Sequence, residues 1–364
     1  MAQRIYLDHA ATTPMLPDAI QAVAEGMRRW ANPSSPHAEG RAARAALEDA
    51  RARIKTALGW DGELIFTSGA SESIAIALGR AQGDQRIVSV VEHDSVMRAA
   101  PDAAQVSVLS DGQVDPERFG PALRRAGDRP VVAVQHVNSE TGVTQPIGEI
   151  VVAVRAAGGV LFSDCAQSAG RLSLPDADLI AVSAHKLGGP PGVGALLVRD
   201  PAMLHPSGGQ ERGYRGGTEN LPGVLGFAAA LDATGPHTDG MADWVRAHIA
   251  NRSRLDAAIE EAGGVAICGA SLRSPLVATY LMPGMQSAAQ LVRFDLAGFA
   301  VSAGSACSSG TLKASPVMAA LRMDPVEAGQ VVRVSFGQTT TLAEIAAFAD
   351  AWTAMAVEAR QRAA

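Results

Sequence analysis

The sequence has few cysteines, few aromatic residues and no long apolar run. Among its 364 residues there are three cysteines, and aromatic residues make up 4%. Cys165, Cys268 and Cys307 form neither an even set nor a CxxC pair, which argues against a disulfide framework or a zinc site and favours a reducing compartment. No apolar stretch reaches the roughly 18 residues of a membrane span. We therefore expect a cytoplasmic protein without a membrane segment, in which at least one thiol is free to react.

Strong charge of either sign is also lacking. The formal net charge of -6 argues against a general binder of phosphate backbones, and the scarcity of aromatic residues leaves no stacking surface for single strands. We therefore expect no direct nucleic-acid binding. There is no HExxH or similar ligand spacing, so we expect no metal site. The apolar share of 47% is sufficient for a large core.

The first two thirds of the chain alternate between short β-branched runs and helical stretches. This alternation predicts an α/β fold in which a mostly parallel sheet lies between helices. The seven predicted strands are residues 64–67, 86–90, 105–109, 131–134, 160–163, 179–182 and 195–198. After a composition shift near residues 233–240 the pattern predicts a smaller α+β unit. Its predicted elements are helices at 241–262, 286–298 and 341–360 and strands at 276–280 and 331–335.

Three segments at predicted strand ends carry residues suited to one kind of cofactor. The turn at residues 66–72 opens a helix whose free amides and Ser71 hydroxyl favour a phosphate, although a turn of this kind more commonly makes only a helix cap. Asp164 follows a buried strand, where a carboxylate needs a positive partner such as a protonated pyridine nitrogen, or else caps a helix. Lys186 ends the next strand among glycines and apolar residues, which favours a desolvated amine able to form a Schiff base over an ordinary surface lysine.

The order of these motifs resembles that of a known enzyme family. Gly69-Ala-Ser-Glu-Ser, Glu92-His, residues 136–142 (HVNSETG), Asp164-Cys-Ala-Gln-Ser and Ser183-Ala-His-Lys follow one another as in the cysteine desulfurases of the NifS/IscS type. These are fold-type I pyridoxal-phosphate enzymes of the class V aminotransferase group. The similarity extends from Tyr6 to about Thr340. It implies a large pyridoxal-phosphate domain (residues 13–238) with a seven-stranded sheet, and a small domain (1–12 and 239–364) that carries a catalytic cysteine.

The resemblance assigns roles to individual residues. Lys186 would carry the cofactor and remove the substrate α-proton, and Asp164 would face the pyridine nitrogen. Gln167 would approach the ring hydroxyl, and His93 would stack on the ring and move protons near the substrate sulfur. The remaining assignments are phosphate contacts at Ala70, Ser71, Ser183 and His185, a phosphate contact in the other subunit of a homodimer at Thr218, and substrate carboxylate contacts at Arg333 and Asn32.

One position departs from the family pattern. Ser139 stands where the family has a cofactor-contacting Asn, so its shorter hydroxyl, or the neighbouring Asn138, would make that contact. Cys165 stands where the family often has Thr, and we read it as a buried small residue. Cys268 reads as part of a core strand.

Cys307 lies in a Gly/Ser-rich segment (301–311) of the kind that forms exposed loops, whereas a structural cysteine is usually buried among apolar neighbours. This favours a reactive thiol, and the family's nucleophile occupies a matching Gly-Ser-Ala-Cys motif. The resemblance then implies conversion of L-cysteine to L-alanine with the sulfur held on Cys307 as a persulfide. A protein acceptor would take the sulfur, for iron–sulfur cluster assembly in the first place, with tRNA thiolation or another sulfur pathway open.

Fold alone does not separate this activity from others on the same scaffold. A selenocysteine lyase, a small-molecule aminotransferase and a kynureninase-like hydrolase remain alternatives. Cys307 argues against the aminotransferase, which needs no thiol. A non-catalytic sulfur-relay or scaffold subunit is an alternative of another class, and the presence of Lys186, Asp164 and Arg333 argues against it.

Overall fold

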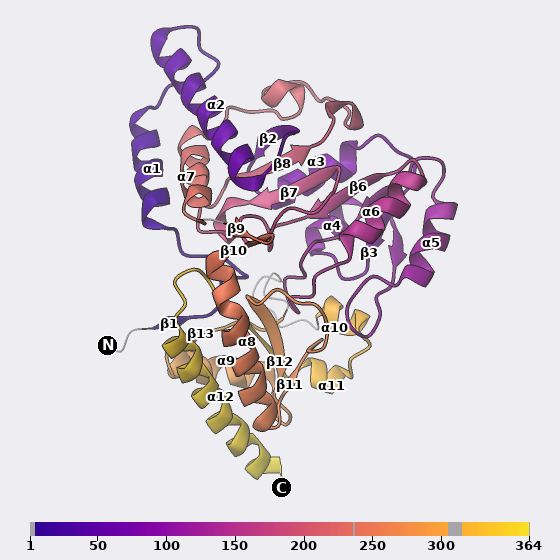
Figure 1. The fold of residues 1–364 in the computed structure, drawn as a ribbon, viewed down its shortest axis with the longest axis vertical. Coiled ribbons are helices and arrows are strands. Elements are labelled where there is room, and N and C mark those ends of the chain that lie inside the picture. The colour runs from indigo at the N-terminus through magenta and orange to yellow at the C-terminus, as the bar shows by residue number, and fades with distance from the viewer. Residues whose placement is uncertain (1–3, 236, 305–314, 364) are drawn as a thin grey trace.

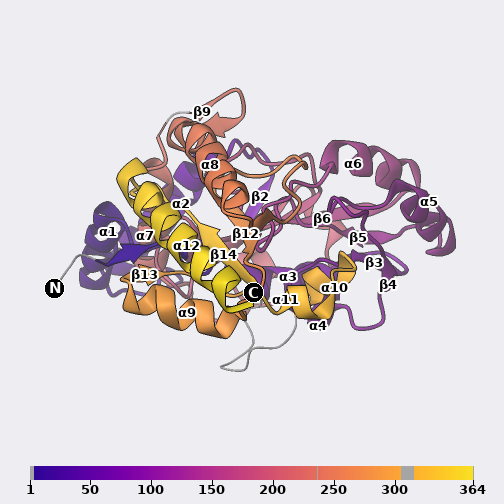
Figure 2. The ribbon, with the colours of Figure 1, turned by 90° about the horizontal axis from the view of Figure 1, so that it is seen from below.

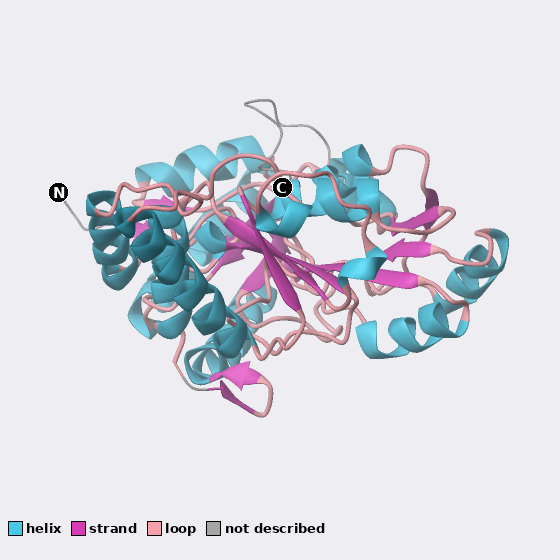
Figure 3. Cartoon of the chain, turned by 90° about the horizontal axis from the view of Figure 1, so that it is seen from above, coloured by secondary structure: helices cyan, strands magenta, loops and turns pink. Residues whose placement is uncertain are grey.

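The computed structural model describes residues 4–235, 237–304 and 315–363. Its centre is a seven-stranded sheet, which lies between two layers of helices (Figures 1 and 3). The strands stand in the order β2-β8-β7-β6-β5-β3-β4. Their bounds are β2 Glu63–Thr67, β3 Arg86–Ser89, β4 Ala104–Val106, β5 Val131–Ala133, β6 Val160–Asp164, β7 Leu179–Ser183 and β8 Gly194–Val198.

The seven predicted strands and the predicted fold class are confirmed. β4 is shorter than expected, because Val108 leaves the sheet and forms an isolated bridge with Val114. β8 pairs antiparallel with both β2 and β7, and the other pairings are parallel. Since β8 alone is reversed, β2, β3, β5, β6 and β7 end at the same edge of the sheet. Ligands of such sheets bind at that edge.

Alternate residues of each central strand enter different cores. On β7, Ile180 and Val182 pack into a core with helices α2 (Ala38–Leu58), α5 (Pro116–Arg125), α6 (Ile147–Ala156) and α7 (Leu221–Asp232). Leu179 and Ala181 pack on the opposite face with α3 (Ala70–Arg80) and α4 (Asp94–Ala99). This alternation explains why the strand sequence is apolar at every position. Outside α7 lies α1 (Pro17–Arg28). Short helical turns occur at η1 Ala184–Lys186, η2 Pro201–Met203 and η3 Glu211–Gly213.

The C-terminal third folds around a second sheet. Its strands are β11 (Val265–Ala266), β12 (Val277–Leu281) and β14 (Val331–Ser335), which pair antiparallel. Helices α8 (Asp243–Glu261) and α12 (Leu342–Ala363) lie side by side over this sheet (Figure 2). The remaining elements are β9 His237–Thr238, β10 Met241–Ala242, α9 Ser287–Leu296, β13 Phe299–Ala300, α10 Pro316–Ala320 and α11 Pro325–Ala328.

The N-terminal strand belongs with this second unit. β1 (Ile5–Tyr6) pairs in parallel with β13, and Leu7 and Ala10 lie in the same core as β12 and α12. We therefore propose to divide the chain into a large domain of residues 13–238 and a small domain of residues 1–12 and 239–364. In the part of the chain that the structure describes, no helix combines the length and the apolarity that crossing a bilayer requires.

His248 is buried between Trp244 and Phe336, because it lies on the face of α8 that packs on the second sheet. One sequence prediction in this unit is wrong. Cys268 was expected in a core strand but follows β11 in a turn, where its φ of 53° is incompatible with a strand. Its thiol is half-buried, and burial raises its pKa to about 11.

Candidate functional site

A cavity of about 350 Å³ opens where the parallel strands end. Ten of the predicted site residues line it: Ala70, Ser71, His93, Ser139, Asp164, Gln167, Ser183, His185, Lys186 and Arg333. The sequence reasoning missed six further lining residues, which are Ala10, Ala11, Ser95, Gln135, Val137 and Ala166. Arg333 comes from β14 of the small domain, whereas the other predicted residues come from strand ends of the large domain. The cavity is therefore walled by both units.

Lys186 occupies the last position of η1, directly after β7. Its Nζ donates hydrogen bonds to the carbonyl oxygens of Ala10 at 2.6 Å and Ala11 at 2.8 Å. Both carbonyls belong to the N-terminal segment, so this segment fixes the amine at the wall of the cavity. An amine in this position can reach a carbonyl carbon bound in the cavity.

Asp164 ends β6 and is buried at the cavity. One carboxylate oxygen accepts a hydrogen bond from the Ala166 amide at 2.9 Å. Burial raises the pKa of Asp164, while this amide bond and the positive charges of His93 and Lys186 act in the opposite direction. A buried carboxylate that faces a cavity is suited to a cationic ligand group.

Glu92 is a second buried acid near Asp164, and sequence reasoning assigned it no role. Its Oε1 accepts a hydrogen bond from the Gln135 amide at 2.9 Å, and its Oε2 has no hydrogen-bond partner among the described residues. Burial raises its pKa well above the usual value, and the nearby Asp164 charge adds to this. Glu92 is therefore a buried acid behind the cavity wall that holds its proton to higher pH than an exposed carboxyl group does.

His93 is oriented by its own helix. It is the N-cap of α4, and its Nδ1 accepts a hydrogen bond from the Ser95 amide at 3.2 Å. The Ser95 hydroxyl lies 2.7 Å from the same nitrogen. Because Nδ1 is an acceptor, the proton of the neutral ring is on Nε2. The His-Asp-Ser sequence at a helix start was the available signal for Ser95.

The predicted phosphate contacts of the same subunit all line the cavity. α3 begins at Ala70, so the first amides of this helix and the Ser71 side chain lie at the cavity wall. The turn before it needs Gly194 on β8, because a Cβ there would lie 2.7 Å from the Gly69 Cα. Burial lowers the pKa of His185 to about 4, as does the neighbouring Lys186 charge, so His185 is neutral at physiological pH. The donors fit a phosphate group.

Ser139 and Asn138 have different surroundings. The Asn138 Oδ1 accepts hydrogen bonds from the amides of Glu140 and Thr141 at 2.9 Å, and its Nδ2 donates to the Val91 carbonyl at 3.2 Å. The side chain thus stabilises the turn after β5 and does not line the cavity. Ser139 does line it. The geometry favours Ser139 over Asn138 for a ligand contact.

Arg333 is buried on β14 and is held by protein groups on two sides. Its Nη2 donates to the Asp8 carboxylate at 2.9 Å, and its Nη1 donates to the Ser139 carbonyl at 3.1 Å. Its Nε has no hydrogen-bond partner among the described residues. The sequence analysis expected a substrate anion beside this Arg and did not identify Asp8 as its partner. Asp8 aims the guanidinium, and the cavity supplies room for a further anion.

Two predicted residues lie outside the cavity. Asn32 is exposed, and its Oδ1 accepts a hydrogen bond from the Ser34 amide at 2.8 Å. Thr218 is exposed as well, in the segment after η3. Neither lines the cavity of its own subunit. Thr218 was expected to serve the other subunit of a dimer, so its position leaves that prediction as it was.

Cys307 lies outside the described residues, but both flanks of its segment are described. The Ser315 hydroxyl donates to the Glu140 carboxylate at 2.6 Å. A Cβ added at Gly304 would lie 2.5 Å from the Glu140 Oε2, so Gly304 packs directly on the same carboxylate. Glu140 follows Ser139 in the cavity wall, and burial raises its pKa. The chain therefore leaves the described structure at Gly304 and re-enters it at Ser315 beside the cavity.

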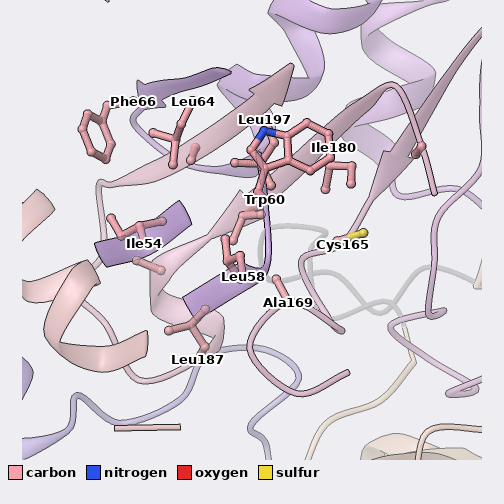
Figure 4. Packing of buried hydrophobic residues seen from close by; sticks show 14 of the residues in the cluster. Ile54, Leu58, Trp60, Leu64, Phe66, Cys165, Ala169, Ile180, Leu187 and Leu197 are labelled. Atoms are coloured by element: carbon pink, nitrogen blue, oxygen red, sulfur yellow. The ribbon is translucent and has the colours of Figure 1, made fainter. Parts of the chain in front are cut away.

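Cys165 behaves as predicted. It is fully buried in the core on one face of the large sheet, among Ile180, Ala169 and Leu187 (Figure 4). Burial raises the pKa of its thiol to about 12, so the thiolate is scarce at physiological pH. Among residues 4–235, 237–304 and 315–363 there is no group of three or more His, Cys, Asp or Glu side chains placed to hold a metal ion.

Comparison with known proteins supports the motif-based resemblance. Residues 5–348 match the family model described as aminotransferase class-V. An IscS-like cysteine desulfurase of Mycobacterium tuberculosis is 34% identical, with 98% of each chain covered. A cysteine desulfurase of Bradyrhizobium diazoefficiens is 35% identical, covering 94% of this chain and 91% of the relative. The crystal structure of a NifS-like protein from Rickettsia africae has a TM-score of 0.84 and 28% identity, covering 97% of this chain and 99% of that one.

Proposed function

The chain belongs to the aminotransferase class-V family, and from this membership and the cavity we propose that it is a pyridoxal-phosphate-dependent cysteine desulfurase. Its substrate is L-cysteine, its products are L-alanine and a persulfide on Cys307, and a protein acceptor takes the sulfur for iron–sulfur cluster assembly or another pathway. The observation that carries the proposal is the cavity itself, which gathers an amine at Lys186, a buried acid at Asp164 and a guanidinium at Arg333.

The residues present fit pyridoxal phosphate. The amides that open α3 and the hydroxyls of Ser71 and Ser183 are donors for its phosphate. The imidazole of neutral His185 is a further hydrogen-bonding group there. Asp164 supplies a buried carboxylate for a protonated ring nitrogen, which would lower the cost of burying that charge. The bound cofactor would store the electron pair released at the substrate α-carbon.

The protein groups then divide the remaining work. Arg333 binds the substrate carboxylate, with its orientation fixed by Asp8 and the Ser139 carbonyl. Lys186 accepts the α-proton as its general base, and His93 exchanges protons at the substrate sulfur through Nε2. The Cys307 thiolate attacks that sulfur. A sulfur–sulfur bond forms as the carbon–sulfur bond breaks, and the electron pair stays on the carbon, which takes up a proton to give alanine.

The assembly that this activity needs is a homodimer in the cytoplasm. Thr218 is exposed and lies outside its own cavity, as a residue that completes the partner's phosphate site would. Closed two-fold pairing is also the commonest form of homo-oligomer.

The proposal is tested by incubating the purified protein with pyridoxal phosphate and L-cysteine. We expect equal amounts of alanine and transferred sulfur from the wild type, and loss of both products in Cys307→Ala with cofactor binding retained. Cys268→Ala serves as the matched control, because its half-buried thiol lies in a turn after β11. Equal product formation by Cys307→Ala and the wild type would refute the proposed role of Cys307. Failure of the wild type to bind the cofactor would refute the whole assignment.

A further inference from the structure

Arg171 is a buried cation behind two residues of the cavity wall, Gln167 and Lys186, and no role has been assigned to it. Only 3% of the residue's surface is exposed. No carboxylate of the described residues lies within ion-pairing distance of its guanidinium. Burial lowers its pKa to about 10, so it remains charged at neutral pH. Burying a guanidinium without a counterion costs free energy, so its retention calls for a role in the surrounding structure.

The acceptors of Arg171 belong to two residues that line the cavity, Gln167 and Lys186, and to Thr13. Its Nη1 donates to the backbone carbonyl and to the side-chain Oε1 of Gln167, both at 3.2 Å. Its Nη2 donates to the Lys186 carbonyl and to the Thr13 Oγ1, the latter at 3.4 Å. The Thr13 hydroxyl in turn donates to the Lys186 carbonyl at 2.8 Å. The guanidinium thus connects the backbone of Lys186 to the side chain of Gln167.

These contacts fix which end of the Gln167 amide can face a ligand. A guanidinium has only donors, so the amide group that faces Arg171 must be the oxygen. On the other side the Gln167 Nε2 donates to the Ala10 carbonyl at 2.9 Å, and a carbonyl has only acceptor sites. Both neighbours therefore select the same orientation of the amide.

The group that Gln167 presents to the cavity is consequently a hydrogen-bond donor. The Ala10 carbonyl already accepts from the Lys186 Nζ at 2.6 Å as well as from Gln167, so its two lone pairs are used. The amide nitrogen of Gln167 has a second hydrogen, and this side chain lines the cavity. A donor here favours an anionic oxygen on the ligand, and a flipped amide would instead present a repulsive oxygen.

We propose that Arg171 is a positioning residue that locks the Gln167 amide with its nitrogen toward the cavity, and so favours a ligand with an anionic ring oxygen. The inference rests on the proposed cofactor site. It assigns Arg171 no contact with the cofactor or the substrate, because its effect passes through Gln167.

The test is a double-mutant cycle on cofactor affinity. Apoprotein of the wild type, Arg171→Met, Gln167→Ala and the double variant is titrated with pyridoxal phosphate, and the dissociation constants are compared. One hydrogen bond to a charged group is worth about tenfold or more in affinity, so each single variant should bind about tenfold more weakly. The double variant should bind no more weakly than Gln167→Ala, because the arginine acts only through the amide.

The controls separate this role from a general effect on the fold. Arg155→Met removes an arginine that is partly exposed and paired with Asp176 and Asp178, and its affinity should equal that of the wild type. If Arg171→Met does not fold, Arg171→Lys replaces it in the cycle. Lysine keeps the charge and loses the planar fork, so it should show a smaller loss and the same non-additivity.

Two results would overturn the inference. One is additive losses of affinity in the double variant, and the other is wild-type affinity in Arg171→Met. Either would leave the proposed function intact, since the wild type would still bind the cofactor. Absence of binding to the wild-type apoprotein would instead refute the proposed function.

Discussion

Two buried arginines of the large domain differ in what surrounds them. Arg51, on α2 and outside the cavity lining, makes a two-pronged pair with the buried Glu211 at 2.8 and 2.9 Å. Glu211 also accepts from the Phe66 amide at 2.7 Å. Arg171, at the cavity, has carbonyl and hydroxyl acceptors and no carboxylate among the described residues. The charge of Arg51 is therefore neutralised by a buried carboxylate, whereas the charge of Arg171 is held by neutral acceptors that belong to Gln167, Lys186 and Thr13.

The same contrast applies to the thiols and acids. Cys165 is sealed in the core, and burial raises its pKa to about 12. Asp164 and Glu92 lie at or behind the cavity wall, and burial raises the pKa of both, which makes them costly unless a ligand or a proton compensates. The difference teaches that the site is built at the expense of local stability. Four variants test it, in order of expected effect.

Lys186→Ala should have the largest effect. Loss of the amine removes both the covalent link to the cofactor and the proposed base, so the yellow absorbance should vanish and cysteine turnover should fall by about 10³-fold or more. Absorbance and alanine formation are measured together. Lys55→Ala is the matched control, because Lys55 donates only to the Asp61 carbonyl at 3.4 Å on an exposed surface. Persistence of the absorbance in Lys186→Ala would show that another amine binds the cofactor.

Arg51→Met should act on stability and not on chemistry. It leaves the Glu211 carboxylate buried without its cation, which costs about 3–5 kcal/mol in the free energy of unfolding. Urea unfolding measures this loss, and cofactor affinity per folded molecule should remain at the wild-type value. A change in cofactor affinity that exceeds the change in folded fraction would break the distinction between the two arginines.

Glu92→Gln should remove a dependence of stability on pH. Burial raises the folded pKa of this acid above the usual 4.5, so the proton stabilises the folded state at low pH. As the pH rises above the unfolded value, this stability is lost at about 1.4 kcal/mol per pH unit until the folded pKa is reached. As the pH rises above the usual value of 4.5, the apoprotein of the variant should lose less stability than the wild type. Glu149→Gln, on the exposed face of α6, is the control. Parallel pH profiles of stability for the wild type and Glu92→Gln would contradict the raised pKa of Glu92.

Gly304→Ala should give the smallest effect and the most selective one. Its Cβ would lie 2.5 Å from the Glu140 Oε2, so the flank of the Cys307 segment must shift. We expect about a tenfold lower rate of Cys307 persulfide formation, equivalent to about 1.4 kcal/mol, with unchanged cofactor affinity. Gly148→Ala, where a Cβ meets nothing within 4 Å, should match the wild type. If Gly304→Ala lowered cofactor affinity as much as it lowered the persulfide rate, the contact with Glu140 would not affect the Cys307 segment selectively.

The sequence predicted the large sheet because its signal is local. Apolar β-branched runs between helical stretches specify buried parallel strands, and the polar residues at their ends fall at one edge by topology alone. Lys186 and Asp164 could therefore be placed together before any coordinates were known, and the family resemblance added His93. The N-capping sequence after His93 likewise holds the signal for Ser95.

The partners that join distant segments could not be predicted. Asp8 and Arg333 are separated by 325 positions, and nothing in either motif indicates that they pair. Arg171 follows Gln167 by four positions in a turn, where spacing does not specify a contact. Cys268 was misread because Val-Ala-Ile has strand-like character, whereas the structure turns immediately after Ala266. At this position tertiary packing overrides the local strand propensity.

The central claim is that Lys186 and Cys307 serve the same bound cofactor. The most direct test mixes the cofactor-loaded protein with one equivalent of L-cysteine, without reductant, and determines by mass spectrometry which cysteine gains one sulfur atom. The account predicts the gain on the peptide that contains Cys307, with Cys165 and Cys268 unmodified, and no gain on any peptide in Lys186→Ala. Sulfur on Cys307 in the absence of the lysine, or sulfur on Cys268 in the wild type, would contradict it.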